Sequence, residues 1–169
     1  MASMLLLSLW LGGALYFASV VAPAAFRVLL APGGAGALVR HTLPQLFVAG
    51  IGTGIAAVLA GVLWRQSRPL VGAAGLLAIS CAVGQFVIGA RLERVRQAIG
   101  GPVGALAPGN PLRIEFGRLH GWSVAALGVA MLAAAAGVVA AWLWRGGGDD
   151  GSRRAASGAD HAASAEPAR

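Results

Sequence analysis

The sequence has no lysine, a single cysteine and few charged residues of either sign. Charged residues make up 11% of the 169, compared with about a quarter in a typical soluble domain, and 57% are hydrophobic. The mean hydropathy is +0.75. A water-soluble fold with so little charge would expose apolar surface that water does not tolerate. The composition therefore excludes an ordinary soluble domain, and it predicts one domain with lipid around most of it.

The lone cysteine excludes an internal disulfide, and it has no second cysteine with which to hold a metal ion. Cys81 lies within an apolar run, so we predict a small buried packing residue. All 13 basic residues are arginine, and the formal net charge is +7. Because these arginines stand at the ends of apolar runs, we expect them to reach lipid headgroups. No basic face with interleaved aromatic residues is present, so nucleic acid is not a predicted partner.

Four long stretches carry no charged residue: 5–26, 42–64, 69–90 and 119–144. A helix of 22 residues, the shortest of these lengths, spans roughly 33 Å, and the hydrocarbon core of a bilayer is about 30 Å thick. Only helices and closed barrels satisfy their backbone groups in lipid, and these stretches lack the alternation of barrel strands. We therefore predict an all-α integral membrane four-helix bundle, with the lipid bilayer as its surroundings.

Turn and capping signals predict where the helices begin and end. Thr42 is the predicted N-cap of the second helix, with Pro44 in its first turn, where a missing N–H costs nothing. Residues 65–68 form a minimal hairpin loop, so the second and third helices are antiparallel neighbours. Asn110 before Pro111 is typical of a helix start. The predicted helices, in a transmembrane domain of residues 1–145, are about 4–30, 42–64, 69–99 and 111–144.

Residues 146–169 have a different composition, rich in Gly, Ala, Ser and charge. A segment with almost no apolar side chains to bury is predicted to be a disordered tail. Its histidine, His161, is expected to be solvated rather than part of a site.

Small residues recur at four-residue spacing along two of the predicted helices. Gly50 and Gly54 form such a pair in the second helix, and Gly117 and Gly121 repeat the spacing in the last. Such faces let backbones approach closely where lipid removes the hydrophobic reason for helices to associate. We expect them to contact neighbouring helices, a second copy of the chain or another membrane protein. Trp10 is predicted to pack inside the bundle.

Four spans place both chain termini at one end of the bundle, here called end A, with the 65–68 hairpin. The opposite end, end B, holds the connection after the first helix and the segment 91–118. Seven arginines lie near the spans at end B, namely Arg27, Arg40, Arg91, Arg94, Arg96, Arg113 and Arg118. Five lie at end A, namely Arg65, Arg68, Arg145, Arg153 and Arg154. The positive-inside rule therefore favours a cytoplasmic end B, with both termini outside.

The same topology groups residues that are distant in sequence. His41 precedes the second helix and His120 opens the last, and both helices run from end B to end A. We therefore expect both histidines at end B, near Arg40, Glu93 and Glu115. The use of arginine without lysine, with abundant Ala and Gly, is typical of a GC-rich bacterial genome, so the predicted location is a bacterial inner membrane.

Several motifs resemble the transmembrane protein 205-like family across residues 4–144. The first-helix runs 10–17 and 21–27 and the segment 43–47 carry part of the resemblance, and residues 116–123 match the family's aromatic-x-x-x-His-Gly-x-Ser signature. The matching residues are Trp10, Gly13, Pro23, Phe26, Pro44, Phe116, His120, Gly121 and Ser123. The resemblance implies four membrane helices and, for bacterial members, no assigned activity. Leu127 stands where many members have asparagine, which leaves the role of that amide in doubt.

A more distant resemblance is to four-helix membrane proteins of haem biosynthesis and copper resistance. Those proteins use histidines inside their helices, whereas the first and third predicted helices here contain none. The sequence therefore predicts no cofactor. A metal or haem site built from His41 and His120, with Glu115 as an outer carboxylate, remains an alternative.

The leading prediction is a non-enzymatic bundle that acts as an accessory or small-solute-handling protein. On this hypothesis His120 and Ser123 hydrogen-bond a neighbouring helix or loop, and Glu115 pairs with Arg118. No catalytic triad, phosphate-binding loop or paired membrane carboxylate is present, so catalysis is not predicted. A transporter or channel subunit, active as an oligomer, is a second alternative, with Gln85 as the most interior polar residue.

Overall fold

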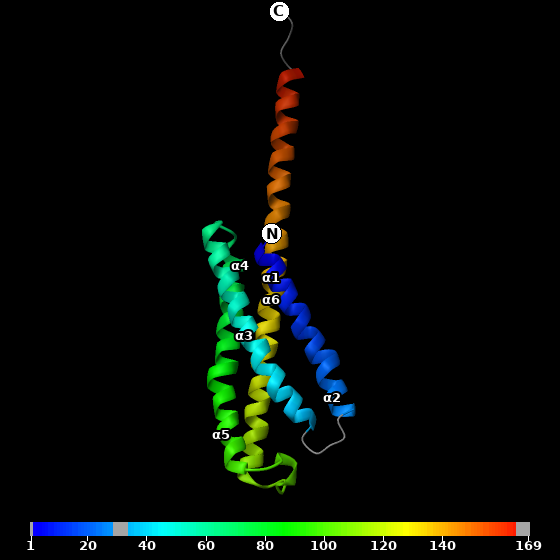
Figure 1. The fold of residues 1–169 in the computed structure, drawn as a ribbon. Coiled ribbons are helices and arrows are strands. Elements are labelled where there is room, and N and C mark those ends of the chain that lie inside the picture. Colours follow the sequence, from blue (N-terminus) through cyan, green and yellow to red (C-terminus); the bar gives the residue numbers. More distant parts are fainter. Residues whose placement is uncertain (1, 29–33, 165–169) are drawn as a thin grey trace, which may run out of the picture.

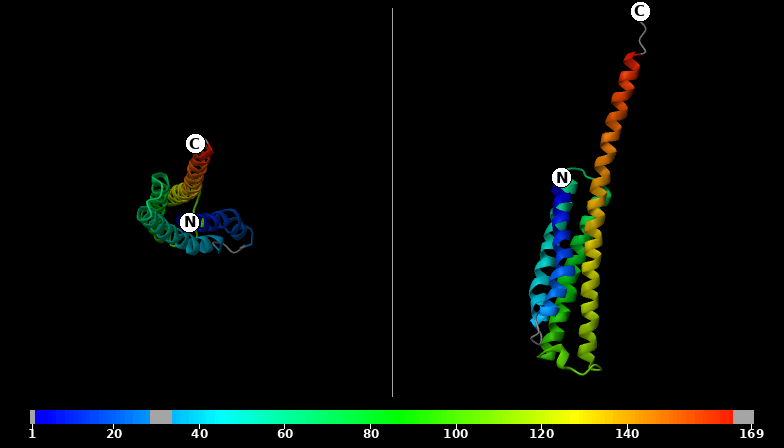
Figure 2. Two further views of the ribbon diagram at one scale, coloured as in Figure 1. Left: turned by 90° about the horizontal axis from the view of Figure 1, so that it is seen from above. Right: turned by 90° about the vertical axis from the view of Figure 1, so that its right-hand side faces the viewer.

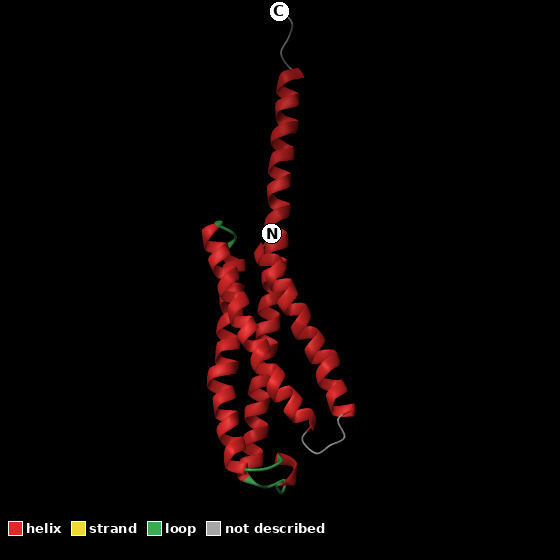
Figure 3. Cartoon of the chain, in the orientation of Figure 1, coloured by secondary structure: helices red, strands yellow, loops and turns green. Residues whose placement is uncertain are grey.

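The computed structural model describes residues 2–28 and 34–164, with side chains described as far as residue 143. Within these ranges every regular element is a helix (Figure 3). They comprise the α-helices α1 to α6, the π-helices η1 and η2 and the short 3-10 helix η3. They join into four long helical rods. The rods run back and forth along one direction (Figure 1). The all-α class is confirmed.

The first rod joins α1 (Ala2–Tyr16), η1 (Phe17–Val21) and α2 (Ala22–Val28). The widened turn has a local cause in Pro23, which has no N–H to donate to the carbonyl of Ser19. The N–H of Ala22 donates instead to the carbonyl of Phe17, five residues back, which is the π-helical pattern. The predicted end of this helix at residue 30 lies outside the described residues.

The second rod is α3 (Gly34–Leu63), which begins well before the predicted start at residue 42. The prediction of Thr42 as an N-cap is wrong, because its hydroxyl donates back to the carbonyl of Leu38 at 3.0 Å inside the helix. Pro44 is likewise an interior helix residue rather than part of a first turn. The residues before Thr42 include Ala and Leu, which favour continuation of the helix.

The hairpin after α3 is confirmed, and it places α3 beside α4 (Arg68–Ala82) in antiparallel order. The N–H of Gln66 donates to the carbonyl of Gly61 at 2.8 Å, which closes the end of α3. Arg65 takes the left-handed conformation that this type of helix end requires, with φ of 47°. Pro69 lies in the first turn of α4, where it interrupts no helical hydrogen bond.

The third rod continues from α4 through η2 (Val83–Gly89) into α5 (Ala90–Ile99). It ends at Gly100, whose φ of 65° suits a residue without a side chain. Within α5, Leu92 and Val95 are buried against Leu119 of the last rod. The predicted helical extension at end B is confirmed. The loop that follows contains η3 (Val103–Ala105).

The last rod, α6, spans Pro111–Ser164. The predicted start is confirmed, because the Asn110 side-chain oxygen accepts the N–H of Leu112 at 2.9 Å and caps the helix. The helix continues well beyond the predicted end at residue 144 and extends past the other rods at end A (Figures 1 and 2). The range of α6 thus includes residues 146–164, part of the stretch that the composition predicts as a tail. Alanine and arginine in this stretch favour helix locally, although its glycines oppose it.

Four helices are long and apolar enough to cross a membrane. They are Ala2–Val28, Gly34–Leu63, Arg68–Ile99 and Pro111–Leu143. The start of α1 and the hairpin between α3 and α4 lie at the same end of the molecule, as the topology predicts (Figure 1). The chain therefore has the architecture of a four-helix membrane bundle.

The main core lies where all four rods meet, and small residues dominate it. Its buried members are Leu7, Trp10, Ala14, Phe47, Ala57, Ala74, Leu77, Cys81, Leu127, Ala130, Ala133 and Ala134. A Cβ atom on Gly54 would lie 2.8 Å from the backbone oxygen of Ala74, so the α3 and α4 backbones are in direct contact there. Lipid provides little hydrophobic drive for helix association, so such close packing is what holds the bundle together.

The rods separate toward end B. Figure 1 shows α2 lying well apart from α5 and from the beginning of α6. A second, smaller cluster of Leu92, Val95 and Leu119 joins α5 to α6 alone, with Ile99 and Phe116 packed against it. This more open end carries the charged side chains discussed next.

Candidate functional site

Two places in the molecule combine the family-like residues with polar contacts. One is the packed junction around Trp10, and the other is a charged cluster at end B. They differ in burial and in chemistry, and we describe the buried junction first.

Trp10 is 5% exposed, and its indole N–H donates to the backbone oxygen of Leu46 at 3.0 Å. The ring reaches this carbonyl because Gly50, one turn further along α3, has no side chain. A Cβ on Gly50 would lie 2.9 Å from the indole nitrogen and 2.5 Å from the sulfur of Cys81. Both Trp10 and Cys81 are therefore interior packing residues, as predicted, and this junction links α1, α3 and α4.

Phe47 and Gly84 form a second contact of the same kind. A Cβ on Gly84 would lie 2.8 Å from the outer end of the Phe47 ring, so this end of the ring lies directly on the backbone of η2. Leu127, at the position where the resembled family often has asparagine, is 8% exposed and belongs to the same core. The side chains of this junction are therefore apolar, with the Trp10 hydrogen bond among them. We interpret the junction as a packing contact that holds the helices together rather than as a binding or catalytic site.

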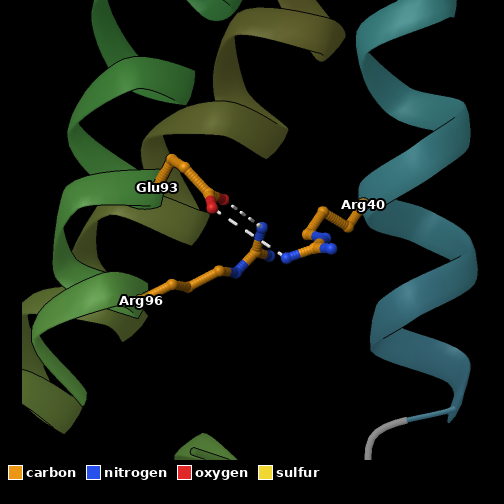
Figure 4. A network of polar contacts seen from close by, with 3 residues as sticks. All are labelled: Arg40, Glu93 and Arg96. Atoms are coloured by element: carbon orange, nitrogen blue, oxygen red, sulfur yellow. Dashed lines mark ion pairs between the residues drawn. The ribbon is translucent and has the colours of Figure 1, made fainter. Parts of the chain in front are cut away.

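The charged cluster at end B is centred on Glu93 of α5 (Figure 4). One carboxylate oxygen lies 3.9 Å from a nitrogen of Arg40 on α3, and the other lies 3.7 Å from a nitrogen of Arg96 on α5. These three side chains are partly exposed. One negative charge therefore faces two positive charges, and the contact joins two rods that are separated in sequence.

Aromatic contacts extend the cluster to α6. The Arg96 guanidinium lies over the ring of Phe116, 5.3 Å from its centroid, a cation–π geometry. The Phe116 ring in turn stacks on the imidazole of His120, with 6.3 Å between centroids and 3° between planes. The contacts run from Arg40 through Glu93, Arg96 and Phe116 to His120, so three helices meet at end B.

The grouping of Arg40, Glu93 and His120 at end B follows from the predicted topology and agrees with this arrangement. His41, next to Arg40 on α3, is exposed. The hydrogen bond predicted for His120 is wrong, because its exposed imidazole stacks on Phe116 of the same helix instead. Ser123 is 3% exposed, on the side of α6 that faces the core.

The predicted pair of Glu115 and Arg118 is not formed. Among the described side chains the ion pairs are those of Glu93 with Arg40 and with Arg96. Sequence reasoning missed the part that Arg96 plays, although its spacing of three residues from Glu93 was a usable signal. No sequence signal reports that the Arg96 guanidinium lies on Phe116, because that contact depends on how α5 and α6 are rotated about their axes.

The described residues contain no group of three or more His, Cys, Asp or Glu side chains that would hold a metal ion. The positive charges of Arg40 and Arg96 also lie near the two histidines, by sequence at His41 and through Phe116 at His120. Like charge disfavours a bound cation. The electrostatics of this end favour an anion instead.

At end A the hairpin borders an open surface hollow of about 460 Å³. Its lining residues are Gly61, Val62, Arg65, Gln66, Arg68 and Val71. Its two arginines have no carboxylate partner among the described side chains, unlike those at end B. The two ends of the bundle thus both carry arginine pairs, but only end B holds its pair with a shared acid.

The fold and these contacts define a four-helix membrane bundle with a packed apolar junction and a charged end. The chain belongs to the family described as a domain of unknown function (DUF4149), whose model matches residues 5–100. No curated protein and no solved structure matches the chain.

Proposed function

We propose that this chain is a non-enzymatic accessory protein of the membrane, which works by associating with other membrane helices. The observation that carries the proposal is an open stripe of glycine on α6. Gly117, Gly121 and Gly128 are spaced by four and seven residues, so they lie on one face of the helix. A Cβ on any of them would meet nothing within 4 Å.

Glycine at such positions requires a reason. In a helix interior it is less favourable than alanine by roughly 1 kcal/mol, and within this chain the open positions gain no close contact in return. Glycines such as Gly54 and Gly137 instead lie directly against a neighbouring helix, and this close contact compensates for the weaker helix propensity. Small residues at four-residue spacing are a common surface for a partner helix in lipid. The stripe therefore suits a second copy of the chain or another membrane protein.

The charged cluster supports a role without catalysis. Glu93 is paired with the guanidiniums of Arg40 and Arg96 rather than with a second acid or a histidine. Arginine itself does not release its proton in proteins. His120 is stacked on Phe116, and no carboxylate among the side chains described as far as residue 143 contacts its imidazole. This arrangement is poor in the oriented acid–base pairs that catalysis uses.

The likeness of residues 116–123 to the transmembrane protein 205-like signature fits this proposal. Those residues lie beyond the matched range of 5–100, so the likeness rests on the motif itself. We place the chain in a bacterial inner membrane, with end B in the cytoplasm, on the basis of arginine usage and the arginine count. A C-terminal reporter that is active on one side of the membrane tests this orientation.

Cysteine cross-linking in native membranes tests the association. In a Cys81→Ala background, Gly121→Cys is expected to form an oxidative cross-link, either to a second copy or to a heavier partner. Gly72→Cys is the matched control, because Gly72 of α4 is also exposed and open. The proposal fails if Gly121→Cys gives no cross-linked product, or if both variants cross-link equally. A product of twice the chain mass identifies a homo-oligomer.

A second candidate function is transport by an oligomer, which one local feature favours. Gln85 is half-buried in η2, a π-helical stretch, and such stretches are frequent at functional sites. Liposome flux that falls with Gln85→Leu would support this alternative. A metal or haem site at His41 and His120 is less favoured, because of the adjacent positive charge. An absorption spectrum of the purified protein tests that alternative directly.

A further inference from the structure

The two guanidiniums at end B are close to an acid but not fully engaged by it. Nitrogen–oxygen distances of 3.9 and 3.7 Å are longer than the roughly 2.7–2.9 Å of a charge-assisted hydrogen bond. Each guanidinium carries five N–H donors. Neither Arg40 nor Arg96 has another hydrogen-bond acceptor among the described residues. Figure 4 shows the two groups side by side, approaching from α3 and α5.

Negative charge is scarce in the surroundings of this pair. Of the side chains described up to residue 143, Glu93 and Glu115 are the only carboxylates, and Glu115 forms no ion pair. Seven arginines lie near the spans at end B. The cluster of Arg40, Glu93 and Arg96 alone has a net charge of +1. An additional anion would neutralise that charge and accept hydrogen bonds from the N–H groups of the two guanidiniums.

The position of the cluster selects the kind of anion. Arg40 lies two residues before the uncharged stretch 42–64, and Arg91, five residues before Arg96, directly follows the stretch 69–90. The cluster therefore lies where apolar helix gives way to polar residues, at the depth of lipid headgroups. Planar guanidiniums match the geometry of phosphate oxygens and bind them in pairs.

The cluster is also held in shape. Phe116 supports the Arg96 guanidinium from α6, and the apolar cluster of Leu92, Val95 and Leu119 joins α5 to α6 nearby. The Arg96 side chain is 25% exposed, compared with 50% for Arg40. The Arg96 guanidinium is thus supported on one face by Phe116, whereas Arg40 is the more exposed of the two. Two donors from different helices face the same carboxylate, so the arginines converge on one place at end B.

We propose that Arg40 and Arg96 bind a phosphate group at the membrane surface, with Glu93 as the internal anion that the phosphate partly displaces. The chemistry fits the phosphodiester of an anionic lipid and also free inorganic phosphate. The proposal is independent of the α6 glycine stripe and of any partner that binds there.

The test uses the full-length protein purified in an uncharged detergent. Native mass spectrometry with equal amounts of phosphatidylglycerol and phosphatidylcholine is expected to show preferential retention of phosphatidylglycerol. Each basic residue near a lipid surface contributes roughly fivefold to such binding, so Arg40→Gln with Arg96→Gln should weaken it by about ten- to thirtyfold. The matched control is Arg65→Gln with Arg68→Gln, which removes the same charge at end A. These two arginines line an open hollow and do not face a shared group, so their loss should weaken retention by a clearly smaller factor.

Glu93→Gln separates a phosphate site from a purely structural ion pair. It removes the competing carboxylate and leaves both arginines, so phosphatidylglycerol retention should rise by roughly fivefold. A fall in retention with Glu93→Gln, or equal losses in the two double-arginine variants, overturns the proposal.

A second arm distinguishes the source of the phosphate. Inorganic phosphate is compared with chloride at equal ionic strength, and the thermal unfolding of the wild-type protein is measured. A rise in melting temperature with phosphate, lost in Arg40→Gln with Arg96→Gln, supports a site that accepts the free anion. Lipid retention without that rise supports a site specific for the lipid headgroup. If neither lipid preference nor phosphate stabilisation is seen, the proposal is wrong.

Discussion

Gly50 and Gly54 in α3 have the same four-residue spacing as Gly117 and Gly121 in α6, yet the two pairs have opposite surroundings. Around the α3 pair every added atom would collide with Trp10, Cys81, Ala74 or Ala78. Around the α6 pair an added Cβ would meet nothing within 4 Å. The comparison shows that a small-residue spacing predicts a face suited to close approach, but does not say whether the approaching helix belongs to the same chain.

The same contrast separates the two regions of the bundle. In the packed region the Trp10 indole donates a hydrogen bond to a neighbouring helix, and small side chains let the helix backbones approach closely. End B is held by partly exposed ion pairs, which contribute little each, and by a cation–π contact. Stability and recognition are therefore expected to lie in different parts of the molecule, and substitutions in each part should differ in effect.

The largest expected effect is at the packed glycines. In Gly54→Ala the new Cβ would lie 2.8 Å from the Ala74 oxygen and 2.9 Å from the Ala78 nitrogen, both backbone atoms that cannot move alone. We expect the free energy of unfolding in detergent to fall by about 1–3 kcal/mol, despite the better helix propensity of alanine. Gly52→Ala is the control, since that position is open. Equal stabilities of the two variants would contradict the close α3–α4 contact.

An intermediate effect is expected at Trp10. Trp10→Phe keeps an aromatic ring in the core but removes the N–H donated to Leu46, so the free energy of unfolding should fall by about 1 kcal/mol. Trp122→Phe, at a side chain that is 62% exposed, should change it by less than about 0.5 kcal/mol. Denaturant titrations followed by circular dichroism compare the two. If the Trp122 variant is the less stable, the assignment of Trp10 as the junction residue is wrong.

The smallest expected effect has the opposite sign. In dilute detergent, where the chain is a single copy, Gly121→Ala should raise the free energy of unfolding by about 0.5–1 kcal/mol, because alanine is the better helix former and the space is free. In membranes the same change should weaken the proposed association. A loss of stability in the isolated protomer would show that a neighbouring helix already fills this space, and the contrast with Gly54 would disappear.

Much of the architecture was predictable from the sequence. Uncharged length predicts the four spans, and the hairpin at residues 65–68 and the Asn110 cap were placed correctly, because these signals are local. The wrong prediction of where the second helix begins also came from a local signal. Thr42 and Pro44 together are typical of a helix start, yet the helix begins at Gly34 and the Thr42 hydroxyl bonds within it. A threonine that caps a helix and a threonine inside a helix differ in whether the residues before them are already helical, and the threonine itself does not reveal this.

The candidate site was predictable in part. Topology alone placed Arg40, Glu93 and His120 at one end, because the second and last helices begin at the end of the bundle where the antiparallel third helix finishes. The predicted Glu115–Arg118 pair failed, while Glu93 bridges two helices instead. Both acids have an arginine three residues away, so spacing did not distinguish them. The two acids differ in the structure because Glu93 also lies 3.9 Å from Arg40 of α3, a contact that spacing within one helix does not predict.

The sequence by itself determined that apolar helices suited to lipid make up most of the chain, how many such helices there are, and at which end of the bundle each polar residue lies. These properties follow from the length and order of apolar stretches, which do not depend on neighbouring helices. Tertiary structure decided which glycines are covered, how deeply Trp10 is buried and which arginines share Glu93. Those outcomes depend on the rotation of each helix about its own axis, and that rotation is set by packing against the other helices in the bundle.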